Sequence, residues 1–167
     1  LVKYFLTALT VPQKDLWVNL SPVEKDRVIP QVLAETDFGK QMLTQDYLLK
    51  QFTANLLSPD NETGRRFWEA VYSKLNSLDI ERIQTDALSR VWIVPSKAEV
   101  YEHNNSVFIV ESQFEVKMDA DYRRTPAKDQ SLMTIARDTI LPVIEREVNE
   151  GEAFASLRQI YHALILA

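Results

Sequence analysis

The chain of 167 residues contains no cysteine, only three glycines and two histidines. The lack of cysteine excludes disulfides, thiolate metal sites and cysteine nucleophiles. Three glycines argue against a loop-rich architecture or one that cradles phosphate. No apolar run approaches the roughly 18 residues that span a bilayer, so we expect no membrane insertion. A net charge of −5 gives no general attraction to nucleic acid.

The remaining composition is that of an ordinary globular domain, with 46% hydrophobic and 26% charged residues. A chain of this length can bury one real core, so we expect a single domain over residues 1–167. The chain begins without methionine and ends within the apolar run Leu164-Ile165-Leu166. We therefore expect it to be an excised part of a longer protein.

Residues 15–27 predict a strand that turns directly into a helix. Leu16, Val18 and Leu20 alternate with polar or aromatic neighbours, as in a strand with one buried side. Ser21 followed by proline and, three residues later, Glu24 is typical of a capped helix start. The cap explains Ser21 better than a nucleophile does, because the flanking glycines of a nucleophile elbow are missing.

Hydrophobic periodicity predicts further helices on both sides of a β-rich region. One runs over residues 37–57, and a second follows a cap at Asp60 or Asn61. Another begins after residue 130, where Pro142 should kink it, and a last helix carries Phe154 and Leu157. A short amphipathic helix is also expected over residues 2–9, with a strand as the alternative because Tyr4 and Phe5 suit strands.

Between these helices the period changes to that of strands. We predict strands at 90–94, ended by Pro95, at 98–103 and at 106–118, with Asn104-Asn105 as a tight turn. The first half of 106–118 is apolar on both faces, so we expect it to be covered on both sides. We expect the second half to face water on one side, and the strand to bend near Ser112. The strand at 16–20 is expected to pair with the strand at 90–94. The predicted fold class is therefore α+β, with an antiparallel sheet of about four strands covered by N-terminal and C-terminal helices.

The candidate site residues are few. Asp46 and Tyr47 form a polar pair amid apolar neighbours, which predicts a buried structural network more readily than a general base. Trp17 alternates away from the apolar side of its strand and could pack under a helix or lie exposed. His103 and His162 are interpreted as surface residues. We predict no catalytic residue, no metal site and no cofactor.

The chain resembles a family of uncharacterised bacterial proteins. The similarity rests on Asp-Leu-Trp-Val-Asn-Leu-Ser-Pro at 15–22 with Glu-Lys-Asp-Arg at 24–27, and on the motifs at 91–95, 147–151 and 157–160. The chain departs from the family pattern at residues 84–89, and its loop at residues 121–130 is shorter than in the family. The resemblance implies a longer parent chain with flanking segments and an export signal, which favours a location outside the cytoplasm. It implies no activity, and no site residue can be transferred from it.

We therefore expect a non-catalytic structural or protein-interaction module of a larger bacterial protein. The alternative is a hydrolase-like enzyme whose site is assembled from scattered carboxylates and aromatic residues. The expected partners are flanking segments of the parent chain and a second copy that associates through the terminal helices.

Overall fold

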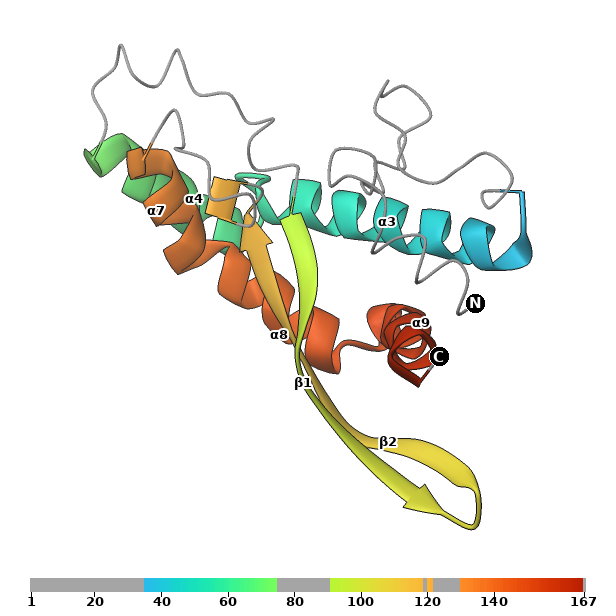
Figure 1. Ribbon diagram of the computed structural model, residues 1–167. Coiled ribbons are helices and arrows are strands. Elements are labelled where there is room, and N and C mark those ends of the chain that lie inside the picture. The colour runs from blue at the N-terminus through green and yellow to red at the C-terminus, as the bar shows by residue number, and fades with distance from the viewer. Residues whose placement is uncertain (1–34, 75–90, 119, 122–129, 167) are drawn as a thin grey trace.

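The computed structural model describes residues 35–74, 91–118, 120–121 and 130–166 (Figure 1). Within these ranges, two helices precede a two-stranded antiparallel hairpin and further helices follow it. The predicted α+β class is thus confirmed. The helix expected at 2–9, the strand at 16–20 with Trp17, and the capped helix after Ser21 lie outside the described residues.

Helices α3 (Asp37–Leu56) and α4 (Glu62–Lys74) confirm the first two predicted helices in this part of the chain. The hydroxyl of Thr36 accepts from the N–H of Gly39 at 3.0 Å and caps α3. Asn61, one of the two predicted caps, accepts from the N–H of Thr63 at 2.9 Å. Each helix start therefore has a local partner for N–H groups that the helix itself leaves free.

The two helices meet closely where α3 ends and α4 begins. A Cβ atom on Gly64 would overlap the carbonyl oxygen of Ser58 and would lie 2.6 Å from that of Leu56. The indole N–H of Trp68 donates to the carbonyl of Leu57 at 2.8 Å. Glycine is needed here because backbone oxygens occupy the space that a side chain would take.

The hairpin consists of β1 (Val91–His103) and β2 (Ser106–Met118). Asn104 and Asn105 have φ of 50° and 60°, which confirms the predicted tight turn. The prediction of two separate strands at 90–94 and 98–103 was wrong, because β1 is a single strand that continues through Pro95. Proline is tolerated there because it lies beside a bulge at Ser96 in a strand with only one neighbour among the described residues. About four strands were expected, and the described residues form two.

The predicted kink at Pro142 is a break between α7 (Gln130–Thr139) and α8 (Leu141–Glu150). Proline has no N–H to donate to the carbonyl of Asp138, so the helix restarts after Ile140. A short 3-10 turn, η3 (Glu152–Phe154), leads into α9 (Ala155–Leu166). Arg158 of α9 donates to the carbonyls of Val148 and Gly151 and thereby closes the C-terminal end of α8.

The core lies between the helices and the inner half of the hairpin, where β1 residues 91–95 pair with β2 residues 114–118. Its fully buried large side chains are Phe67, Phe114, Phe154, Met118, Leu132, Ile135, Ile140, Ile144, Val71 and Val148. The outer half of the hairpin extends well beyond the helices (Figure 1). The expected cover of the first half of β2 was therefore wrong, because that half is largely exposed. The second half is buried on one side and faces water on the other, as expected.

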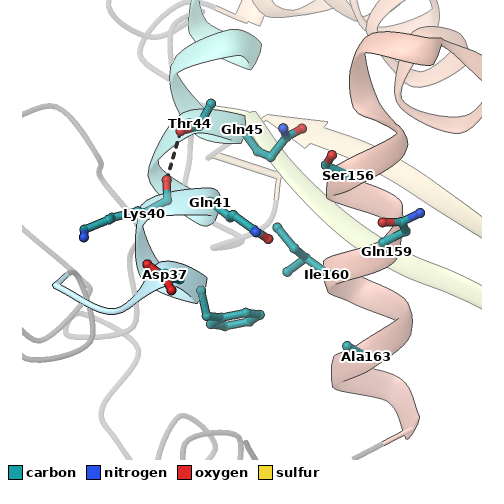
Figure 2. Close-up of a pocket in the computed structure, with 10 residues that line it drawn as sticks. Asp37, Lys40, Gln41, Thr44, Gln45, Ser156, Gln159, Ile160 and Ala163 are labelled. Carbon is teal, nitrogen blue, oxygen red and sulfur yellow. Dashed lines mark hydrogen bonds between the residues drawn. The ribbon is translucent and has the colours of Figure 1, made fainter.

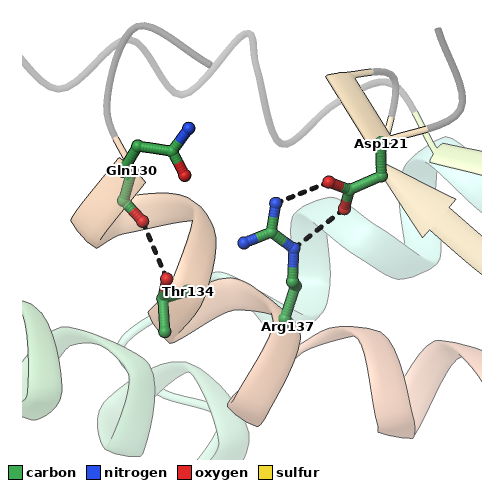
Figure 3. Close-up of polar contacts among 4 residues, drawn as sticks. All are labelled: Asp121, Gln130, Thr134 and Arg137. Carbon is green, nitrogen blue, oxygen red and sulfur yellow. Dashed lines mark hydrogen bonds and ion pairs between the residues drawn. The ribbon is translucent and has the colours of Figure 1, made fainter. Parts of the chain in front are cut away.

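A bidentate ion pair connects the segment after β2 to α7. Both carboxylate oxygens of Asp121 accept from the Arg137 guanidinium, at 2.8 and 2.6 Å (Figure 3). The hydrogen bonds from Arg137 lower the pKa of Asp121, although partial burial opposes this shift. This pair fixes the helix that follows the hairpin to the end of the hairpin itself.

Candidate functional site

Helix α8 closes the free edge of β2 along the inner half of the hairpin. The side-chain oxygen of Asn149 accepts from the N–H of Phe114 at 2.9 Å, and its amide donates to the carbonyl of Phe114 at 2.9 Å. Next to it, the carboxylate of Glu145 accepts from the N–H of Val116 at 3.0 Å. These side chains make the bonds that a third strand would make, so this part of the edge is protected.

The outer half of the hairpin, residues 98–110, has no such cover among the described elements, and we call it the arm. Five of the eight exposed large hydrophobic side chains in the described chain lie on it: Val100, Tyr101, Val107, Phe108 and Val110. Their exposed fractions run from 47% for Val107 to 68% for Val110. Such a concentration of exposed apolar side chains on one element is typical of a surface that binds another chain.

The charges of the arm are unevenly placed between its strands. In β1, Glu99 and Glu102 flank the apolar residues, and just below the arm Lys97 bonds Glu111 at 2.8 Å. The hydrogen bond from Lys97 lowers the pKa of Glu111. In contrast, residues 106–110 of β2 read Ser-Val-Phe-Ile-Val and carry no charge. The outer edge of β2 is therefore the neutral, apolar edge of the hairpin.

A second candidate is a groove of about 700 Å³ between α3 and α9 (Figure 2). Polar side chains from both helices line it: Gln41, Thr44, Gln45, Ser156 and Gln159. The hydroxyl of Thr44 donates to the carbonyl of Lys40 at 3.0 Å, within its own helix. The lining also includes the charged residues Asp37 and Lys40 and the apolar residues Phe38, Ile160 and Ala163, so it is mixed and selects no single class of ligand.

Gln45 is the unusual residue of this groove. Its side chain is 7% exposed, and its oxygen has no hydrogen-bond partner in the described part of the chain. An unpaired buried amide costs roughly 1–3 kcal/mol. The periodic pattern of α3 missed Gln45, because a polar residue at this position predicts an exposed side chain.

The structure does not bring the predicted site residues together. Asp46 pairs with Lys50 at 3.0 Å, one turn along α3. Tyr47 is 61% exposed, and its hydroxyl accepts from Gln51 at 2.8 Å, so the expected buried pair with Asp46 is not formed. Consecutive residues of a helix point about 100° apart, which explains the separation. Trp17 lies outside the described residues.

One contact that sequence reasoning missed joins β2 to α9. Ser112 Oγ and His162 Nε2 lie 2.6 Å apart, and the His162 ring stacks on Phe114. His162 is thus half-buried, and its interpretation as a surface residue was wrong. Burial, and then the charge of Arg158, lowers the pKa of His162, so the ring is neutral at neutral pH and its tautomer sets which of the two groups donates. Residues 50 positions apart carry no local signal for such a pair.

The Ser112–His162 pair resembles half of a hydrolytic site but lacks its electrostatic arrangement. In a catalytic triad a carboxylate orients the histidine and stabilises its charged form. Here the charged group that affects His162 is the cation Arg158, which destabilises that form. The pair therefore suits a structural link between hairpin and helix better than proton transfer from a nucleophile.

Five carboxylates of the described chain are paired with cations. Ion pairs join Asp46 to Lys50, Glu62 to Arg66, Glu111 to Lys97, Glu115 to Lys117 and Asp121 to Arg137. Within the described ranges, no group of three or more acidic or histidine side chains is placed to hold a metal ion. In the same ranges, no helix is both long and apolar enough to cross a bilayer.

Comparison of the chain with protein families, curated proteins and solved structures gives no match.

Proposed function

We propose that this chain is a non-catalytic protein-interaction module of a larger bacterial protein, and that the arm is its contact element. The observation that carries this proposal is the contrast between the composition and the exposure of the arm. Val107, Phe108 and Val110 read as a strand that should be covered, yet each is about half exposed or more. Cover supplied by another chain resolves this contrast.

The remaining features support a binding role for the module. The inner half of the hairpin donates to Asn149 and Glu145 of α8 and accepts from Tyr161 of α9, so the arm projects from a rigid base. A rigid contact element loses little conformational entropy on binding. The enzyme alternative has less support, because the ion-paired carboxylates and the Ser112–His162 pair are explained by structural roles.

The proposal extends to the wider protein. We propose that residues 16–20 add a further strand to the hairpin, along β1, and that flanking segments of the parent chain contact α9. Leu166 of α9 is 43% exposed and offers such a surface. A location outside the cytoplasm remains part of this proposal.

Site-specific photocrosslinking in bacterial cells that contain the full parent protein tests the role of the arm. A photoreactive residue at Phe108 should give discrete protein adducts, including adducts with a second copy of the chain. The matched control places the same residue at Glu69, an exposed position on α4. If Phe108 gives no more adducts than Glu69, the arm is not a contact element and the proposal fails.

A further inference from the structure

The arm has two edges, and they differ in what could pair with them. Glu99 and Glu102 lie along the β1 edge, whereas the β2 edge from Ser106 to Val110 is uncharged. Like charges directly opposite each other destabilise a strand pair. The β2 edge is therefore the one that can meet an identical edge without charge repulsion.

The edge of β2 is also protected in one half only. Asn149 and Glu145 occupy the backbone groups of Phe114 and Val116. Within the described ranges, no side chain forms a hydrogen bond with the β2 backbone of the arm. An uncharged strand edge rich in β-branched and aromatic residues is a template for a further strand.

The register of the hairpin shows which backbone groups point outward. His103 and Ser106 flank the two-residue turn and are partners in the ladder, as are Glu102 and Val107. Hydrogen-bonded and non-hydrogen-bonded pairs alternate in an antiparallel ladder, and the pair that flanks a two-residue turn is hydrogen-bonded. The N–H and C=O groups of Val107 and Ile109 therefore point away from β1.

From this arrangement, and resting on the proposed function, we propose that the chain forms a two-fold symmetric dimer in which the β2 edges of two arms pair antiparallel about Phe108. In this register Val107 of one copy lies opposite Ile109 of the other, where both present outward backbone groups. All five residues of the uncharged stretch then pair with one another, and the two hairpins become one four-stranded sheet.

Neighbouring registers are less favourable. Centring the pair on Ile109 would place Glu111 of one copy opposite Val107 of the other. Centring it on Val107 would use Asn105 of the turn, which has a positive φ. A pair of identical edges about a two-fold axis is also closed, which limits further growth.

Because the chain has no cysteine, single-cysteine variants test this geometry directly. In the proposed dimer the two Phe108 Cα atoms would be about 4.5 Å apart, within the range that a disulfide spans. The two Tyr101 residues would be separated by three strand spacings, roughly 14 Å, which is too far. Tyr101 is the matched control, since its exposed fraction of 56% is close to the 54% of Phe108.

Mild oxidation of the 167-residue chain should therefore give a disulfide-linked dimer with Phe108→Cys and little with Tyr101→Cys. Equal yields would indicate random encounter and would overturn the proposal. Light scattering after size-exclusion chromatography should show a dimer for the unmodified chain at high micromolar concentration. A monomer there would also overturn it.

A charge-swap series checks the register without a covalent bond. Phe108→Lys and Phe108→Glu each place like charges at the two-fold axis and should weaken the dimer by about tenfold or more, whereas a 1:1 mixture should restore it. Unchanged circular dichroism in each variant separates this result from misfolding. If photocrosslinking at Phe108 captures only other proteins, the dimer fails while the interaction module stands; if it captures nothing, both fail.

Discussion

Replacing Asn149 tests whether a side chain of α8 acts as a substitute strand. The carboxamide makes three hydrogen bonds of 2.8–2.9 Å: it accepts from the N–H of Phe114 and donates to the carbonyls of Phe114 and Glu145. Asn149→Ala removes all three and leaves the backbone groups of Phe114, a residue that is 1% exposed, without their partner.

The expected cost follows from these contacts. Three hydrogen bonds at about 1 kcal/mol each give roughly 3 kcal/mol. Alanine favours the helix by about 0.5 kcal/mol relative to asparagine, which offsets part of the loss. We therefore expect Asn149→Ala to lower the free energy of unfolding by about 2–3 kcal/mol, measured by urea denaturation with an unchanged m-value.

Asn55→Ala is the matched control, because Asn55 is an exposed residue on α3. It carries the change in helix propensity alone and should leave stability within about 0.5 kcal/mol. Amide exchange gives a second readout: the Phe114 N–H should exchange faster in Asn149→Ala, while the Val116 N–H, bonded to Glu145, should change less. If the two alanine variants were equally stable, the side chain of Asn149 would not protect this edge.

Three further outcomes are expected. Gly64→Ala should destabilise the chain by about 1–3 kcal/mol in thermal or urea unfolding, because its Cβ would meet the backbone oxygens of Ser58 and Leu56; a neutral effect would contradict the close approach of α3 and α4. Gln45→Met should raise the free energy of unfolding by about 1 kcal/mol, since methionine has a similar volume and lacks the buried, unpaired carboxamide oxygen; a loss of stability would indicate that this oxygen has a partner. Because the pKa of His162 is lowered by burial, the unfolded chain takes up a proton first as the pH falls below 6.5, so stability should fall from pH 7.5 to pH 5.5. His162→Gln should lose that part of the pH dependence, and an identical pH profile would show that His162 does not contribute to it.

The structural role of Asn149 and Arg158 also explains two of the motifs on which the family resemblance rests. Asn149 lies in the motif at 147–151 and binds β2, and Arg158 lies in the motif at 157–160 and caps α8. Both contacts hold the hairpin and the C-terminal helices in place. One residue in each of these motifs therefore has a structural role.

Local physics explains which features could be predicted from the sequence. The capped starts of α3 and α4, the Asn104-Asn105 turn and the break at Pro142 depend on steric and hydrogen-bonding rules that act within a few residues. The cap of α4 at Asn61, the turn and the interruption at Pro142 were predicted and are present, whereas the Thr36 cap of α3 was found only in the structure. Pro95 shows the limit of such rules: it usually ends a strand, yet the pairing of β1 with β2 continues past it through a bulge.

Tertiary packing decided the rest, because it depends on residues that are far apart in sequence. The alternation along β2 predicts that successive side chains point to opposite faces of the hairpin. It does not indicate which half of the strand the helices cover, and in the structure α8 covers the second half. Phe114 and Asn149 are 35 positions apart, and Ser112 and His162 are 50 apart, so no local pattern signals either contact. Gln45 is buried and the arm is exposed for the same reason: burial is set by where the helices and strands meet, and composition gives only the average tendency of each residue.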